Sequence, residues 1–311
     1  MSLALSSTAD NLNKKPLKAS DLFSRASPKG TLSRVLQFPL IRIFIGLLFL
    51  APVLAANGAF VLLVIENLEE PFATYMDIGR LVAMFGLLLI AYRYYCNLVE
   101  KRPAHEVSSN GALKETIIGV LVAFGIVGLT VALMGALGYY KIQSFEPAII
   151  LINSAAMYTA GSMMQELISR LLIFRLIEEY AGSIIAFIAS SLIFGLLHYG
   201  NDNATIGSVV ALTITSFVFV GPFMLTRRVW MVLGIHIGWN FSQTGIFGMP
   251  NSGNAWPGWI KPTIDGPNWL TGGAWGIEMS FFTIALALLV SLWFLRAVIK
   301  NKQVVAPKWR R

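Results

Sequence analysis

The sequence feature that most restricts the fold is a series of long apolar segments separated by short polar ones. Of the 311 residues, 56% are hydrophobic and only 13% are charged, and the mean hydropathy is +0.66. Soluble domains carry about 25% charged residues, so this chain has too little polar surface to cover a globular core. A helix that crosses a bilayer needs about 20 apolar residues. The sequence therefore predicts an all-α polytopic membrane protein.

The apolar segments are sufficient for about eight transmembrane helices. We expect them over residues 39–65, 77–97, 115–139, 148–172, 183–198, 206–225, 229–246 and 273–298. The third segment contains several small residues that would let a neighbouring helix approach closely. These are Gly119, Gly125, Gly128 and Gly135. The sequence contains no internal repeat, which argues against the common transporter architectures.

Charge in the loops predicts how the helices are oriented. The two tails are basic, the loop after the first helix is acidic, and the next loop carries Arg93, Lys101, Arg102 and Lys114. Because Lys and Arg concentrate in cytosolic loops, we expect a multi-pass protein of the cell (inner) membrane with both termini in the cytosol. The net charge of +8 is explained in this way, and no nucleic-acid partner is expected.

Composition also divides the chain into regions. We expect a basic, disordered cytosolic tail, three N-terminal helices, a functional core, an outer loop with the last helix, and a second basic tail. Their boundaries are residues 1–36, 37–147, 148–253, 254–300 and 301–311.

Several polar side chains lie inside the apolar segments, where each costs free energy and needs an explanation. Glu166 and Arg170 have i, i+4 spacing, which by itself fits a structural ion pair. His236 and Asn240 have the same spacing and project from one helix face, which also fits hydrogen bonding between helices. Such pairs gain meaning only if the fold brings them together.

A turn in the core predicts that some of these residues meet. Gln165 lies sixteen residues before Ala181, and His198 lies sixteen residues after Gly182. A hairpin that turns at Ala181-Gly182 has equal arms of about 24 Å and brings Gln165 or Glu166 level with His198. His236 would lie about 12 Å into the membrane from the end of its helix. We therefore expect one polar layer in helices four, five and seven, reachable from the cytosol.

At this point the sequence resembles the CAAX protease and bacteriocin-processing (Abi) family over residues 148–253. The family motifs are two glutamates, three residues and arginine; phenylalanine, three residues and histidine; and histidine, three residues and asparagine or aspartate. The matching positions are Gln165-Glu166 with Arg170, Phe194 with His198, and His236 with Asn240. Each motif alone is weak, but three in order inside apolar segments are a specific signal.

The resemblance implies an intramembrane endopeptidase. In the family, the first glutamate and the histidine of the second motif activate a water, and the third motif stabilises the oxyanion. Arg170 and Phe194 would support these groups. The implied partners are the lipid bilayer and a peptide substrate, either prenylated or a leader peptide.

This chain departs from the family at residue 165, where glutamine replaces the first glutamate. An amide cannot accept a proton at physiological pH, and Glu166 points about 100° away on the helix. Three interpretations remain open: Glu166 works with His198, the chain is a natural pseudoenzyme, or Gln165 is an introduced substitution.

Other mechanisms and functions also remain open. A metallopeptidase would hold zinc with Glu166, His198 and His236, although we favour a glutamic mechanism without a cofactor. The alternative functions are an inactive membrane scaffold or bacteriocin-immunity protein with the same fold, and a small-solute transporter.

Overall fold

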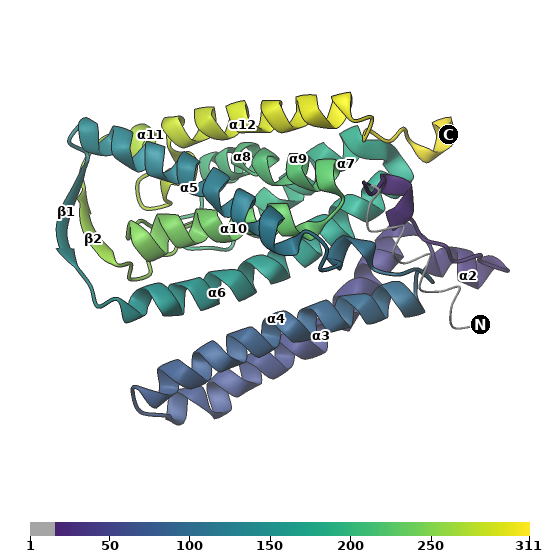
Figure 1. Ribbon diagram of the computed structural model, residues 1–311, viewed down its shortest axis with the longest axis horizontal. Helices are drawn as coiled ribbons and strands as arrows, with labels where there is room; N and C mark the ends of the chain where they lie inside the picture. Colours follow the sequence, from purple (N-terminus) through teal and green to yellow (C-terminus); the bar gives the residue numbers. More distant parts are fainter. Residues whose placement is uncertain (1–15) are drawn as a thin grey trace.

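The structure, a computed structural model, describes residues 16–311 of the chain. It is a bundle of long helices that run along one common axis (Figure 1). The long helices are α3 (Pro39–Leu63), α4 (Phe72–Leu98), α5 (Ala112–Ala136), α6 (Ile149–Glu166), α7 (Arg175–Leu197), α10 (Val229–Asn240) and α12 (Phe281–Lys300). Two shorter helices, α8 (Ile206–Thr215) and α9 (Phe217–Thr226), follow each other as one further segment. The all-α polytopic membrane fold is thus confirmed.

Within residues 16–311, six helical stretches are long and apolar enough to cross a membrane, rather than the eight expected. One of them, Ile149–Leu197, is 49 residues long and contains two of the expected helices, which meet at a kink at the non-helical Gly182. The segment 229–246 is not among the six, since α10 has only 12 residues before the helix type changes. Most of α10 is buried by other helices instead of facing lipid.

Helix α10 lies in the centre of the bundle, and glycines let α5 pack directly on it (Figure 1). A Cβ atom added to Gly119 would lie 2.3 Å from the Met231 carbonyl oxygen, and one added to Gly234 would lie 2.2 Å from the Thr116 carbonyl oxygen. The prediction for the third helix therefore holds at Gly119. Residues Gly125, Gly128 and Gly135 have no such close neighbour.

The helix hairpin of the core turns where the sequence predicts. Gly182 has φ +83°, a conformation that side chains with a Cβ rarely adopt, and the C-terminal tail packs against it. Ser183 anchors this contact: its backbone N–H donates to the Val305 carbonyl at 3.0 Å, and its hydroxyl accepts from the Val305 N–H at 2.8 Å. The hairpin therefore ends against the C-terminal tail.

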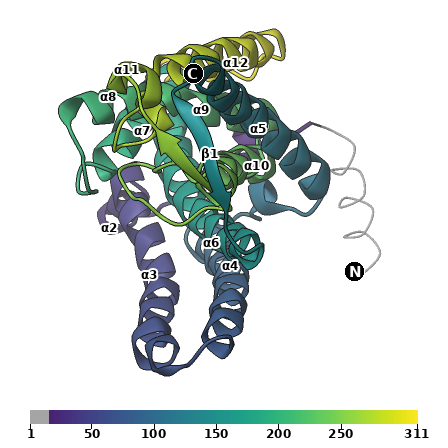
Figure 2. The ribbon, with the colours of Figure 1, turned by 90° about the vertical axis from the view of Figure 1, so that its left-hand side faces the viewer.

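The two ends of the bundle carry different parts of the chain (Figures 1 and 2). The C-terminus and the described N-terminal residues lie at one end, together with the loops around residues 99–111 and 227–228. The other end carries the loop 64–71, the loop 199–205 and the long segment 247–280. There, β1 (Tyr140–Phe145) pairs antiparallel with β2 (Ile260–Ile264), a small sheet that the sequence does not predict.

Two expectations about the ends are wrong. Residues 16–36 are not disordered: they contain a 3-10 turn and helix α2 (Thr31–Leu36), and Leu17, Ala19 and Leu22 are buried. Residues 1–15 lie outside the described part. The last long helix begins at Phe281 rather than at 273, because Gly272, Gly273 and Gly276 adopt positive φ and form a loop.

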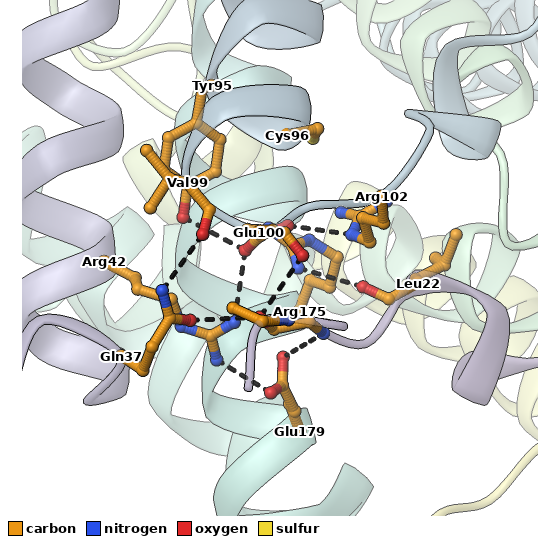
Figure 3. A network of polar contacts seen from close by, with 12 residues as sticks. Leu22, Gln37, Arg42, Tyr95, Cys96, Val99, Glu100, Arg102, Arg175 and Glu179 are labelled. Carbon is orange, nitrogen blue, oxygen red and sulfur yellow. Dashed lines mark hydrogen bonds and ion pairs between the residues drawn. The ribbon is translucent and has the colours of Figure 1, made fainter. Parts of the chain in front are cut away.

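A buried ion network ties the N-terminal helices to the core at the end that carries the termini (Figure 3). Glu100 is fully buried and binds three guanidinium groups: Arg175 at 2.8 Å, Arg102 at 2.8 Å and Arg42 at 3.3 Å. Arg42 also reaches Glu179 at 2.9 Å. Burial alone would raise the pKa of Glu100, but the three guanidinium groups outweigh burial and lower it.

Candidate active site

A cavity of about 220 Å³ lies between helices α6, α7, α8, α9 and α10 and the loops at the end that lacks the termini. Five residues from the three sequence motifs line it: Gln165, Phe194, His198, His236 and Asn240. The hairpin argument thus places Gln165 and His198 correctly in one cavity. That His198, His236 and Asn240 share one water remains a prediction.

The first motif divides between the cavity and the protein interior. Gln165 lines the cavity, and its side-chain oxygen is buried without a hydrogen-bond partner. Glu166 is absent from the cavity wall and fully buried. One carboxylate oxygen lies 2.7 Å from His236 Nδ1, and the other lies 3.2 Å from Arg170 Nε. Glu166 therefore holds other side chains in place and does not face the cavity.

Arg170 is also fully buried, and aromatic rings cover it. Its guanidinium carbon lies 5.5 Å from the centre of the Phe194 ring and 5.9 Å from that of Phe219. Cation–π contacts of this kind compensate part of the cost of a buried charge. The Glu166–Arg170 ion pair expected from the spacing is present, and it forms the inner wall behind the cavity.

The second motif fixes the tautomer of a histidine. His198 Nδ1 lies 2.8 Å from the Phe194 carbonyl oxygen, which can only accept, so Nδ1 donates. In the neutral ring, Nε2 then carries no proton and can accept a hydrogen bond. The Phe194 ring lies 4.8 Å from the His198 ring and 5.9 Å from the His236 ring, centre to centre. Phe194 thus packs between the two histidines of the cavity.

The third motif is held from a loop. Asn240 Oδ1 accepts from Asn251 Nδ2 at 2.9 Å, which orients the Asn240 amide. Asn201 Nδ2 donates to the Ser252 carbonyl at 2.8 Å and links the loop after α7 to the same segment. The amide group of Asn240 therefore keeps its N–H donors for a ligand in the cavity.

One π-helix begins within the first motif, and another begins directly after the third. Residues Leu167–Phe174 form one after Glu166, and Phe241–Ile246 form another after Asn240. Such wide turns are rare and are found mostly at functional sites. The sequence argument assumed regular α-helices throughout and missed both segments.

The residues considered as zinc ligands do not form a compact cluster in residues 16–311. Among residues 16–311, no group of three His, Cys, Asp or Glu side chains lies close enough to hold a metal. Of the proposed zinc ligands, Glu166 binds Arg170 and His236 and is absent from the cavity wall. The mechanism without a cofactor stays a prediction.

The cavity approaches the end of the bundle that lacks the termini, and access from the cytosol stays a prediction. The lining residues beyond the motifs include Asn201, Ser252, Asn254, Trp256 and Glu278, which all belong to loops at the end that lacks the termini. The sequence argument measured depth along each helix, and depth alone does not show which end of a helix the cavity approaches.

Sequence reasoning also missed Glu278, a buried carboxylic acid in the cavity wall. Glu278 is 1% exposed, lines the cavity and accepts from Gln243 Nε2 at 2.9 Å and from the Ser252 N–H at 3.0 Å. It thereby fixes the loop that carries Asn251. Its only signal in the sequence is a lone acid just before an apolar segment, which usually indicates a helix start.

Glu278 is expected to make stability depend on pH. Burial raises its pKa to about 7, above the value of about 4.3 for an unfolded chain. The folded protein therefore keeps a proton that the unfolded chain releases, and this stabilisation is lost as the pH rises to about 7. We expect the thermal midpoint in detergent to be lower at pH 8 than at pH 5. Glu278→Gln should make this difference smaller.

Asp202→Asn is the matched control, because it removes an exposed carboxylate at the same end of the bundle. If Glu278→Gln and Asp202→Asn leave the same pH dependence, protonation of Glu278 does not support the fold.

Comparison with known proteins agrees with the motifs. Residues 147–242 match the family described as type II CAAX prenyl endopeptidase Rce1-like. Searches among curated proteins and solved structures gave no match. The matched region contains α6, α7 and α10 and all three motifs. The match over residues 147–242 thus agrees with the resemblance to the CAAX protease and bacteriocin-processing family that the three motifs indicate.

Proposed function

We propose that this chain is an intramembrane endopeptidase that cleaves a peptide bond in the cavity, with a low rate because residue 165 is glutamine. The observation that carries the proposal is that Gln165, His198, His236 and Asn240 line one cavity. These groups come from three separate segments of the chain, and a purely structural role would not require them to share a cavity wall.

Each of these side chains has a role in the proposed reaction. A water attacks the peptide carbonyl carbon and gives its proton to His198 Nε2, the free acceptor of that ring. The Gln165 side-chain oxygen, which has no partner, accepts the other proton of the water as a hydrogen bond and orients it. His198 then protonates the leaving nitrogen as the C–N bond breaks. A carboxylic acid and an amine leave the cavity.

The third motif would stabilise the charge that develops on the carbonyl oxygen. Asn240 offers N–H donors, because its oxygen is already bonded to Asn251. His236 donates through Nε2 when both ring nitrogens carry protons, while Nδ1 stays bonded to Glu166. Donors aimed at a developing oxyanion are a large source of rate acceleration. Glu166 and Arg170 are positioning residues in this scheme.

A second candidate is a membrane protein that binds a peptide without cleaving it. Gln165 favours it, because the side chain at the position of the family's base cannot take a proton at physiological pH. For either function, the partners are the bilayer and a peptide, and no cofactor is required. We place the chain in the cell (inner) membrane with both termini in the cytosol, because basic residues gather at the end that carries the termini.

Replacement of His198 tests the proposal. In proteoliposomes, His198→Ala should lower cleavage of a fluorogenic peptide library about 10²–10⁴-fold, as expected for loss of a positioned base. The assay is run on the chain as it stands and on Gln165→Glu, so that the rate is measurable.

The matched control is His105→Ala, which removes a histidine from a loop outside the cavity. Cleavage that survives His198→Ala, or that falls equally in His105→Ala, would show that His198 is not the base. Peptide binding without cleavage in both backgrounds would favour the second candidate.

A further inference from the structure

The cavity has a floor and a mouth that belong to different levels of the bundle. Its floor is formed by residues near the middle of the long helices, including Gln165, Phe219 and His236. Its mouth is formed by Asn201, Asn254 and other residues of the loops 199–205 and 250–257. No lining residue comes from the described loops or tails at the end that carries the termini.

The protein between this floor and the end with the termini is tightly packed. The buried Glu166–Arg170 pair lies directly behind the cavity, with Phe219 over the guanidinium group. Beyond it, Phe174 and Phe223 are fully buried, and their rings lie 5.7 Å apart. These buried side chains separate the floor of the cavity from the loops at that end.

The two ends differ strongly in charge. At the mouth end, acidic residues dominate, and the basic residues in the described part of the chain are Arg80, Lys141 and Lys261. The segments at the mouth end contain the acidic residues Glu66, Glu69, Glu70, Asp77, Glu146, Asp202, Asp265 and Glu278. The segments at the opposite end contain the acidic residues Asp21, Glu100, Glu106, Glu115, Glu178 and Glu179. They also contain the more numerous basic residues Lys18, Arg25, Lys29, Arg34, Arg42, Arg93, Lys101, Arg102, Lys114, Arg175, Arg227, Arg228, Arg296, Lys300, Lys302, Lys308, Arg310 and Arg311.

Lys and Arg near the ends of membrane helices stay on the cytosolic side of the bilayer. This rule places the end with the termini in the cytosol and the mouth of the cavity on the other side. We infer that the cavity receives its peptide from the non-cytosolic side of the membrane. That the ligand is a peptide substrate rests on the proposed function. The side of entry does not depend on it.

The substrate class follows from this side of entry. The ligand is an extended peptide segment that has already crossed the bilayer, such as the exported part of a membrane or secreted protein. Ser162 is 2% exposed, lines the cavity, and its hydroxyl has no partner, so it is available to a peptide backbone. Translocation of the substrate across the membrane must therefore precede its cleavage.

Thiol labelling tests the side of entry without any need for catalysis. Cys96 is the single cysteine and is buried, so Cys96→Ala provides a background without thiols. We would introduce Asp202→Cys at the mouth, Ser162→Cys inside the cavity and Lys308→Cys at the opposite end. Spheroplasts are treated with a charged, membrane-impermeant methanethiosulfonate reagent, and the remaining thiols are counted by a gel shift after denaturation.

We expect Asp202→Cys and Ser162→Cys to be blocked in intact spheroplasts, and Lys308→Cys only after permeabilisation. Asn254→Cys is a second position at the cavity wall if Ser162→Cys does not fold. Labelling of Lys308→Cys from outside, or failure of both cavity positions to react from outside, would overturn the inference. Loss of peptidase activity in any assay would not change these patterns, so the two proposals fail separately.

Discussion

Replacing Gln165 by glutamate is expected to raise the rate of peptide cleavage about 10²–10⁴-fold, the usual contribution of a positioned base. The new carboxylate would occupy the cavity wall near His198, where the amide oxygen now has no hydrogen-bond partner. It could accept the proton of the attacking water, which the amide cannot do. The change is nearly isosteric, so the packing around the cavity should be preserved. Initial rates in proteoliposomes measure the effect.

Two variants serve as controls for this gain. Glu166→Gln should lower the cleavage rate, because Glu166 positions His236 and Arg170. Gln165→Glu should still raise the rate when Glu166→Gln is also present. Adding His198→Ala to Gln165→Glu should remove the gain. If Gln165→Glu leaves the rate unchanged while Glu166→Gln abolishes turnover, Glu166 is the base and the roles assigned here to the two neighbours are wrong.

Glu100→Gln is expected to lower the free energy of unfolding by about 3–5 kcal/mol, because breaking a buried ion pair leaves uncompensated charge. Three guanidinium groups converge on this carboxylate (Figure 3). The next carboxylate available to Arg175 belongs to Glu106, at 3.8 Å. A neutral amide cannot balance them. The variant should show a clearly lower thermal midpoint in detergent and a smaller yield of monodisperse protein.

Glu66→Gln is the control for this prediction, since it makes the same chemical change at an exposed position in the acidic loop. Exposed substitutions usually change stability by less than about 0.5 kcal/mol. Equal thermal midpoints for the two variants would show that Glu100 does not hold the N-terminal helices to the core.

The sequence predicted those parts of the site that depend on local geometry. A glycine turn with equal arms places Gln165 opposite His198, and i, i+4 spacing places Glu166 beside Arg170. Contacts between distant segments could not be predicted in this way. Glu278 reaches the site from a loop after the matched domain, and the network around Glu100 joins α3, α7 and the loop after α4. Spacing along the chain contains no information on which loops cover the cavity.

The π-helix after Glu166 has a consequence for how this domain can vary. Each residue added to an α-helix rotates the following side chains by about 100°, and a π-helical turn contains one extra residue. Residues Leu167–Phe174 therefore set the angular phase between α6, which carries Gln165 and Glu166, and the hairpin end with Arg175. A deletion of one residue there would restore a regular α-helix and turn a different face of α6 toward the cavity. Insertions and deletions can thus exchange which neighbour faces the ligand, with no substitution at either position.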